Sequence, residues 1–153
     1  MSPAMWRQFL RPGFQAFTAL GKRYGYKVAH HSCGSIKPII PDLIECGLDI
    51  LNPIQPEARD MGCSDLKRLF GDRLCFHGSL SIQHTLPFGT PEQIRHEVRD
   101  RFEALGPGGG FIFCTAHNIQ ADTPVENVGV LLDAYREFGR RAGQSYGGVK
   151  GND

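Results

Sequence analysis

Apolar residues along the chain fall into two patterns that indicate alternating strands and helices. Short runs bounded by turn residues predict strands at residues 27–31, 49–52, 73–77 and 111–114. Apolar residues spaced three and four apart predict helices at residues 3–24, 36–44, 64–70, 90–105 and 123–138. Because a helix follows each strand, the chain is predicted to contain four consecutive strand-helix units.

Polar and turn-forming residues mark the ends of these elements. Thr90-Pro91-Glu92-Gln93 combines an N-cap threonine, a proline at the first helical position and a glutamine three residues after the cap, which predicts a capping box. Thr123-Pro124-Val125-Glu126 repeats this pattern before the last helix, and Ser64 is the expected N-cap of the third helix. Pro12-Gly13 is expected to break or kink the first helix, and the segment from Pro53 to Pro56 is predicted to be a loop.

Four strand-helix units in succession predict an α/β fold with parallel strands and right-handed crossovers. Four units are half of a (β/α)8 TIM barrel, which typically takes about 250 residues. In an open or a closed parallel sheet, functional side chains gather beyond the carboxyl ends of the strands. The polar, glycine-rich residues 143–153 are predicted to be a flexible C-terminal tail, which leaves residues 1–142 for the folded part.

Composition narrows the class of protein. The chain carries 17 Lys+Arg against 16 Asp+Glu, and this balance argues against binding nucleic acid or a membrane surface through bulk charge. No stretch approaches the ~18 consecutive apolar residues of a spanning helix, and the first ten residues lack a basic-then-apolar secretion signal. Five cysteines, an odd number, indicate core residues or metal ligands rather than a disulfide framework. We expect a soluble, cytoplasmic protein.

His31-Ser32-Cys33 stands where the first predicted strand opens into a loop. Residues two apart in an extended chain project to the same side, so the imidazole and the thiol can converge on one ion. Zinc accepts such ligands, and a catalytic zinc site has three protein ligands and an open position. The exit of the fourth strand offers the third ligand, either His117, which lies further into the loop and is favoured, or Cys114. A histidine that is simply hydrogen-bonded near a buried thiol would give the same pattern.

Four more polar residues lie near strand ends. His77 and Ser81 follow the third predicted strand, where they could bind substrate, support a zinc ligand or only satisfy loop backbone groups. Asn52 and Gln55 follow the second strand and could contact substrate amides or hydroxyls, although Asn before Pro is also a turn device. We take Asn52, Gln55 and Ser81 as candidate substrate-binding residues, and His77 with His117 as candidate catalytic residues.

Several short segments, in order, resemble the C-terminal half of the uroporphyrinogen decarboxylase superfamily. They are His31-Ser32-Cys33-Gly34, Ile50-Leu51-Asn52-Pro53-Ile54-Gln55-Pro56, Cys75-Phe76-His77-Gly78, Thr85-Leu86-Pro87-Phe88-Gly89-Thr90-Pro91-Glu92 and His117-Asn118-Ile119-Gln120. The closest resemblance is to the branch of zinc-dependent methyltransferases that work with corrinoid proteins. It implies a (β/α)8 barrel, of which residues 1–142 would hold strands five to eight.

The resemblance also implies a metal site and a reaction. In the methyltransferase branch a His-x-Cys pair and a later ligand hold zinc, which here gives His31, Cys33 and His117. In thiol-methylating members the later ligand is a cysteine, so His117 is a departure from that pattern. The implied reaction moves a methyl group between a small-molecule donor or acceptor and the corrinoid of a partner protein, with zinc as Lewis acid.

Two other functions remain open. The decarboxylase branch needs no cofactor and also carries a histidine at the position of His117, but it holds its substrate carboxylates largely through the N-terminal half. A non-catalytic half-barrel module is the other alternative. Whether this half acts as an enzyme alone is a separate question, because open parallel strands need a cover. The cover would come from a missing N-terminal half or from a second copy in a homodimer.

Overall fold

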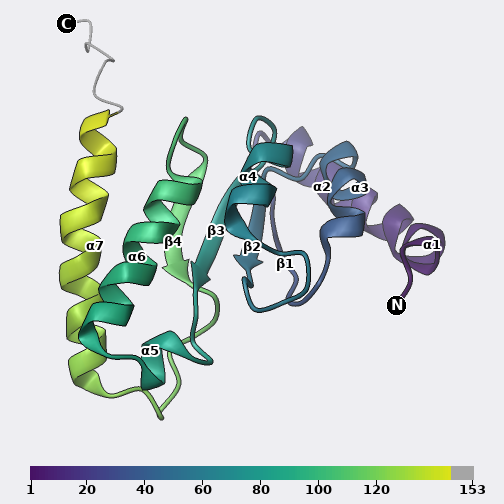
Figure 1. Ribbon diagram of the computed structural model, residues 1–153. Coiled ribbons are helices and arrows are strands. Elements are labelled where there is room, and N and C mark those ends of the chain that lie inside the picture. Colours follow the sequence, from purple (N-terminus) through teal and green to yellow (C-terminus); the bar gives the residue numbers. More distant parts are fainter. Residues whose placement is uncertain (146–153) are drawn as a thin grey trace, which may run out of the picture.

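Four parallel strands form the centre of the molecule (Figure 1). The computed structural model describes the backbone of residues 1–145 and the side chains of residues 1–139. The strands are β1 (Ala29–His31), β2 (Ile50–Ile54), β3 (Cys75–Leu80) and β4 (Phe111–Thr115), hydrogen-bonded in the order β1-β2-β3-β4. A helix follows each strand, so the predicted α/β class with four strand-helix units is confirmed.

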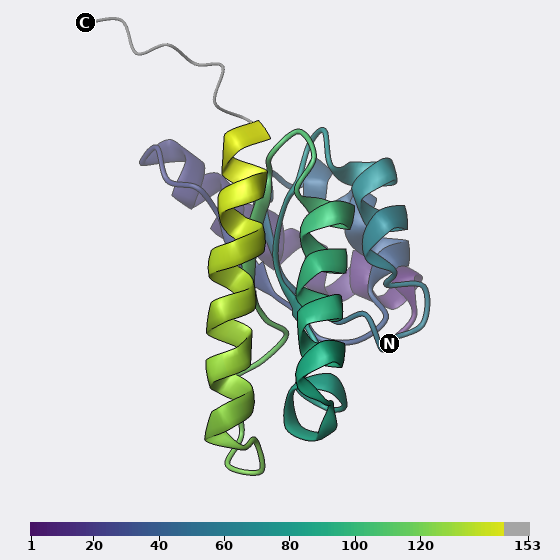
Figure 2. The same ribbon diagram turned by 60° about the vertical axis from the view of Figure 1, so that its left-hand side comes forward.

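Helices precede the sheet and connect its strands. They are α1 (Pro3–Met5), η1 (Trp6–Leu10), α2 (Arg11–Arg23), η2 (Lys37–Ile39), α3 (Ile40–Glu45), α4 (Cys63–Phe70), α5 (Thr85–Phe88), α6 (Pro91–Leu105) and α7 (Val125–Ser145). In Figures 1 and 2, α4, α6 and α7 lie on one side of the sheet. The tail predicted from residue 143 lies, beyond Ser145, outside the described residues.

The helical run before β1 changes type where a break or kink is predicted. The segment η1 is a π-helical turn, and Pro12 lies in the first turn of α2, directly after it. Because proline has no backbone N–H to donate, it sits most easily in the first turn of a helix. The irregular turn at η1 therefore lets Pro12 begin a new α-helix without interrupting the run.

The two faces of the sheet differ in what covers them. On one face Leu51 and Phe76 are fully buried against the helices. Their core also holds Trp6, Ile40, Leu43, Leu66 and Leu105, while a second core holds Leu80, Leu86, Ile94, Val98, Leu131 and Ala134. The alternate strand residues His31, Asn52 and His77 point to the other face and are exposed or half-buried. Three of the candidate residues, His31, Asn52 and His77, therefore lie on the open face of the sheet.

Two strands run further than predicted. Pro53, predicted to begin a loop, continues β2 to Ile54, and β3 extends from the predicted end at His77 to Leu80. The pairing of β2 with β3 shifts register between Leu51 and Ile54. Proline is tolerated at such an irregularity because a ladder hydrogen bond is already missing there.

Of the three expected helix caps, one is confirmed and two are wrong. The capping box at Thr90 is confirmed, since Gln93 donates its backbone N–H to Thr90 Oγ1 at 3.3 Å and Thr90 N–H donates to Gln93 Oε1 at 2.8 Å. The expected cap at Ser64 is wrong, because α4 begins at Cys63 and its N-cap is Gly62, two residues before the expected cap. The second capping box is also absent: α7 begins at Val125, and Thr123 Oγ1 is buried without a partner among the described residues.

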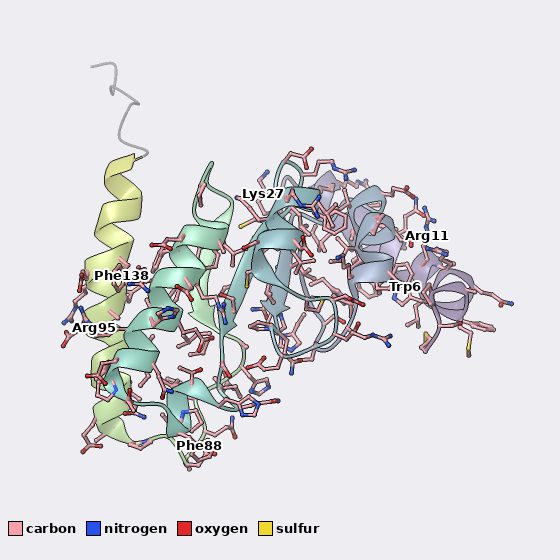
Figure 3. All side chains as sticks on the ribbon, viewed as in Figure 1. Trp6, Arg11, Lys27, Phe88, Arg95 and Phe138 are labelled. Atoms are coloured by element: carbon pink, nitrogen blue, oxygen red, sulfur yellow. The ribbon has the colours of Figure 1, made fainter. Side chains whose placement is uncertain are left out.

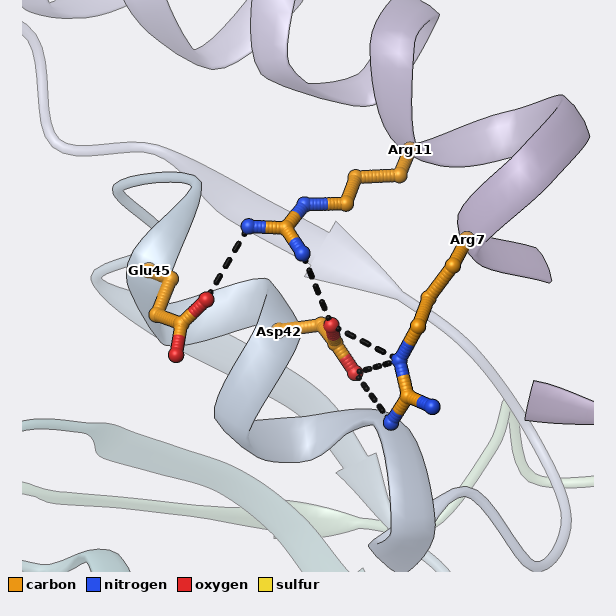
Figure 4. Close-up of polar contacts among 4 residues, drawn as sticks. All are labelled: Arg7, Arg11, Asp42 and Glu45. Carbon is orange, nitrogen blue, oxygen red and sulfur yellow. Dashed lines mark hydrogen bonds and ion pairs between the residues drawn. The ribbon is translucent and has the colours of Figure 1, made fainter. Parts of the chain in front are cut away.

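A nearly buried carboxylate ties the N-terminal helices to α3 (Figure 4). Arg7 donates through Nε to both oxygens of Asp42 at 3.0 Å, and its Nη2 lies 2.9 Å from Oδ2. Arg11 bridges Asp42 at 3.1 Å and Glu45 at 3.0 Å. The hydrogen bonds from Arg7 lower the pKa of Asp42, against the burial that would raise it. This cluster fixes η1 and α2 against the outer side of the first strand-helix unit.

We predict that Asp42→Asn lowers the free energy of unfolding by about 2 kcal/mol, because hydrogen bonds to charged groups contribute about 1.5–3 kcal/mol. The folded-state pKa of Asp42 is depressed, so its contribution is present above the unfolded pKa of about 3.9 and is lost as pH falls through the folded value. Urea unfolding followed by circular dichroism at pH 7 and at several values below pH 4 (about the unfolded pKa) should show the two proteins converging.

The matched control is Asp65→Asn, which removes an exposed carboxylate paired with Arg68 on α4. Exposed pairs contribute little, so this variant should keep the wild-type urea midpoint. Equal losses in the two variants would contradict a special role for Asp42.

Candidate functional site

The His-x-Cys pair converges as predicted from its spacing. His31 is the last residue of β1, and Cys33 lies two residues further in the loop. Cys33 Sγ stands 3.3 Å from His31 Nε2, and both residues are exposed. The loop is held from the next strand, because Gly34 donates its N–H to Gln55 Oε1 at 2.9 Å. Gln55, predicted to bind substrate, therefore contacts the loop that carries Cys33.

An amide links the two histidines of the open face. His31 pairs with Asn52 in the register of β1 and β2, and His31 Nδ1 lies 2.7 Å from Asn52 Oδ1. Asn52 Nδ2 lies 3.1 Å from His77 Nδ1. Since Oδ1 only accepts and Nδ2 only donates, His31 carries its proton on Nδ1 and His77 accepts at Nδ1. The lone pair of His31 Nε2 is thereby directed at Cys33.

The exit of β4 brings His117 toward the same place. The ring centroids of His31 and His117 are 6.3 Å apart, nearly perpendicular, and Thr115 Oγ1 donates to the His117 carbonyl at 2.6 Å. Cys114, the alternative third ligand, has its sulfur 3.9 Å from Thr115 Oγ1. Within residues 1–139, no three His, Cys, Asp or Glu side chains are grouped closely enough to hold a metal. Two donors are thus in place, and His117 lies beside them.

The donor pair fits zinc. With Zn–S near 2.3 Å and Zn–N near 2.0–2.1 Å, two tetrahedral ligands lie about 3.5 Å apart. The separation of Cys33 Sγ and His31 Nε2, 3.3 Å, is close to this value. A hydrogen bond from the other ring nitrogen to an amide oxygen is the usual support of a metal-binding histidine, and Asn52 supplies it.

Ser81, predicted to bind substrate, lies apart from this network. It is buried, its Oγ accepts a hydrogen bond from the backbone of His84 at 3.2 Å, and its N–H donates to Glu97 Oε1 at 3.0 Å. His30 also lies apart, because it points to the covered face and packs edge-on against Phe14 with ring centroids 4.9 Å apart. Burial lowers the pKa of His30, and the neighbouring His31 adds to this shift.

The sequence patterns did not identify the ion pair between Glu97 and Arg101 on α6. Glu97 on α6 is buried, and Arg101 one turn later donates to Glu97 Oε1 at 2.6 Å and to the Ser79 carbonyl at 3.0 Å. A signal was available, because Glu97 lies between Ile94 and Val98 on the apolar stripe of α6, where a solvent-facing residue is not expected.

A family model for uroporphyrinogen decarboxylase (URO-D) matches residues 1–138. The chain belongs to the uroporphyrinogen decarboxylase family. The methylcobamide:CoM methyltransferase MtaA of Methanosarcina barkeri is 30% identical to this family member over 138 residues, 90% of this chain and 38% of the relative. The uroporphyrinogen decarboxylase of Pseudoalteromonas translucida is 42% identical over 77 residues, 49% of this chain and 21% of that enzyme.

A solved structure agrees with the sequence comparison. A methyltransferase from Methanosarcina mazei superposes on this uroporphyrinogen decarboxylase family member with a TM-score of 0.73 and 29% identity, over 90% of this chain and 38% of the solved one. The predicted fold, four strand-helix units of a (β/α)8 barrel, is thereby confirmed. The chain spans less than two fifths of the length of these relatives. No described helix is long and apolar enough to cross a membrane.

We predict opposite tautomers for the two linked histidines. In metal-free protein above the histidine pKa range, His31 should carry its proton on Nδ1 and His77 on Nε2, because Asn52 accepts from one and donates to the other. Long-range ¹H–¹⁵N spectra of the imidazoles report this directly. Asn52→Ala should remove both preferences, whereas Asn118→Ala, an exposed amide in the β4-α7 loop, should change neither. Identical tautomers in wild type would contradict the network.

Proposed function

We propose that this chain is the metal-binding half of a methyltransferase that moves a methyl group to or from the corrinoid of a partner protein. His31, Cys33 and His117 would hold the zinc ion, with Cys114 as the alternative third ligand. The observation that carries the proposal is the 3.3 Å approach of Cys33 Sγ to His31 Nε2, with Asn52 fixing the ring from behind. The likeness to methyltransferases over 90% of the chain supports it.

The side chains of the open face would have different roles in holding the metal and the substrate. Asn52 orients His31, and Gln55 orients the backbone after Cys33, so that the two donors are held before a metal arrives. When bound, zinc would supply Lewis-acid stabilisation of a thiolate or alkoxide acceptor. Two neutral imidazoles and one thiolate leave the site near +1, which favours an anionic acceptor. His77 faces the same space and is the candidate for contacting the small-molecule methyl donor or acceptor.

The corrinoid would approach the open face from the carboxyl ends of the strands, where His31 and His117 are exposed. A cytoplasmic location is part of the same proposal, since Cys33 must remain a reduced thiolate to serve as a ligand.

Decarboxylation without a cofactor is the second candidate. It is favoured by the 42% identity to a uroporphyrinogen decarboxylase over 77 residues, a closer likeness than the methyltransferase shows over its longer alignment. In this case His117 and His77 would contact the carboxylates of a tetrapyrrole, and Cys33 would have no role. A non-catalytic half-barrel would bind neither substrate. Metal content separates the methyltransferase from the decarboxylase, whereas a non-catalytic half-barrel, whose His-x-Cys pair holds metal or nothing, is separated by the absence of turnover.

We predict about one zinc per chain in protein purified without added metal and analysed by atomic emission. His31→Ala and Cys33→Ala should each lose most of it, because either change removes one of the two donors already in place. Cys75→Ala is the control, since Cys75 lies on β3 away from the pair and should leave zinc content unchanged. Metal-free wild-type protein with a native circular dichroism spectrum would overturn the methyltransferase proposal.

The reaction itself is tested with methylcobalamin and a thiol acceptor, in the presence of the complementary half of a related barrel. Loss of the methyl group from cobalt is followed by absorbance. We expect turnover that Cys33→Ala reduces by at least a hundredfold and that Cys75→Ala leaves intact. Release of carbon dioxide from a tetrapyrrole, unaffected by Cys33→Ala, would favour the decarboxylase instead.

The open sheet must be covered in the working protein. Ile112 on the edge strand β4 is 43% exposed, and Phe17 on α2, beyond the other edge, is 78% exposed. We propose that a second copy, or the N-terminal half of a longer barrel, covers these edges.

We predict that the isolated chain forms a dimer at micromolar concentration in light scattering, with the two sheets closing one barrel. Ile112→Lys should shift the chain to monomer, because a charge would be buried at the β4 edge. Leu69→Lys, on α4 in the middle of the half-barrel, should not. A monomeric wild-type chain would contradict the dimer, and the N-terminal half of a longer barrel would then be the proposed cover of the sheet edges.

A further inference from the structure

A cleft of about 790 Å³ opens between the β2-α4 loop, the β3-α5 segment and the first turns of α6. It lies at the end of the sheet toward which the strand arrows point in Figure 1, where α5 is found, and Figure 3 shows Phe88 at that end. These elements belong to the middle strands rather than to the open edges. The lining residues of the cleft therefore come from the central elements of this half of the barrel.

A buried carboxylate oxygen at the wall of the cleft lacks a donor. Glu97 is 8% exposed and lines the cleft. Its Oε1 accepts from Ser81 N–H at 3.0 Å and from Arg101 at 2.6 Å, while Oε2 is buried and has no partner among the described residues. Leaving a buried charged acceptor unsatisfied costs free energy, so a native structure usually provides a donor for it.

The charge of the cleft favours a cation as that donor. Glu57, Glu92 and Asp100 line it together with Glu97, and Arg101 is the one Arg or Lys in the described lining. The backbone hydrogen bond of Glu92 and the Thr90 hydroxyl lower the pKa of Glu92, so this carboxylate stays charged. Two histidines, His84 and His96, also face the cleft, and His96 Nδ1 lies 2.9 Å from Asp100 Oδ2. At a pH where the histidines are neutral, carboxylates outnumber the guanidinium four to one.

The size and the rim of the cleft fit an organic cation better than a bare ion. Its volume lies within the range of about 300–1,000 Å³ that is typical of small-molecule sites, and the cleft is open to solvent. Phe88 lines it and is 71% exposed, which leaves an aromatic face free for a cation.

We propose that this cleft binds an organic cation with a primary ammonium or guanidinium group, whose N–H donates to Glu97 Oε2 and whose charge lies against Phe88. The proposal does not rest on methyl transfer, because the cleft is lined by none of His31, Cys33, Asn52, His77 and His117; of the candidate site residues it includes Ser81, whose N–H donates to Glu97 Oε1. The cation is either a free small amine or the Lys or Arg side chain of a protein that docks at the carboxyl end of the sheet. Both sources share the chemistry that the cleft recognises.

Titration calorimetry at pH 8 and low salt tests this. The probes are putrescine and spermidine for the free amines, and the capped peptides acetyl-Gly-Lys-Gly-amide and acetyl-Gly-Arg-Gly-amide for the protein side chains. We expect one site per chain for at least one class, and no heat from butane-1,4-diol, which lacks the charge. Binding of amines alone assigns a small-molecule ligand, and binding of peptides assigns a protein partner.

Three variants distinguish specific binding in the cleft from general electrostatic attraction to an acidic surface. Glu97→Gln should weaken binding at least tenfold, and Phe88→Leu, at an exposed position that does not disturb the fold, should weaken it about threefold to fivefold. Glu103→Gln removes an exposed charge two turns later on α6, outside the cleft, and should leave binding unchanged. No binding by any probe would overturn the proposal. So would equal weakening by Glu103→Gln, or wild-type affinity in both Glu97→Gln and Phe88→Leu.

Discussion

The pairing of His31 with Asn52 across β1 and β2 is the constraint on which the candidate site depends. Parallel strands place their carboxyl ends at one edge, and a one-residue slip of either strand would turn its side chains to the opposite face. In the observed register the Asn52 amide reaches one histidine on each side. The buried alternate residues Leu51 and Phe76 resist a slip, because it would move them from the core into solvent. The hydrophobic core thus sets the geometry of the polar face.

The sequence was informative where the chemistry is local. Residue spacing predicted that His31 and Cys33 converge, and the capping box at Thr90 formed because its two partners lie three residues apart on one helix. The same motif at Thr123 failed because α7 begins one residue later than a box there requires. The link from Asn52 to both histidines could not be predicted, since a single sequence does not state which residues of neighbouring strands lie opposite each other. The approach of His117 depends on a loop without periodicity.

The comparison with relatives and the open edges of the sheet both relate this chain to part of a larger barrel. The chain matches relatives of which it covers less than two fifths, and Phe17 and Ile112 are exposed at its edges. The site geometry nevertheless forms inside this half, because its residues come from the adjacent strands β1, β2 and β3 and from the loops that follow β1, β2 and β4. The cleft beside Glu97 likewise needs only the central strands and α6. Covering the edges would therefore add walls to these sites without supplying their central groups.

The Asn52 amide gives the polar network a direction. An amide has one donating end and one accepting end, so the hydrogen bonds are donated in one direction, from Cys33 to His31, from His31 to Asn52 and from Asn52 to His77. Reversing any one link reverses its neighbours. The proton positions of His31 on β1 and His77 on β3 are therefore coupled through a single amide on the strand between them.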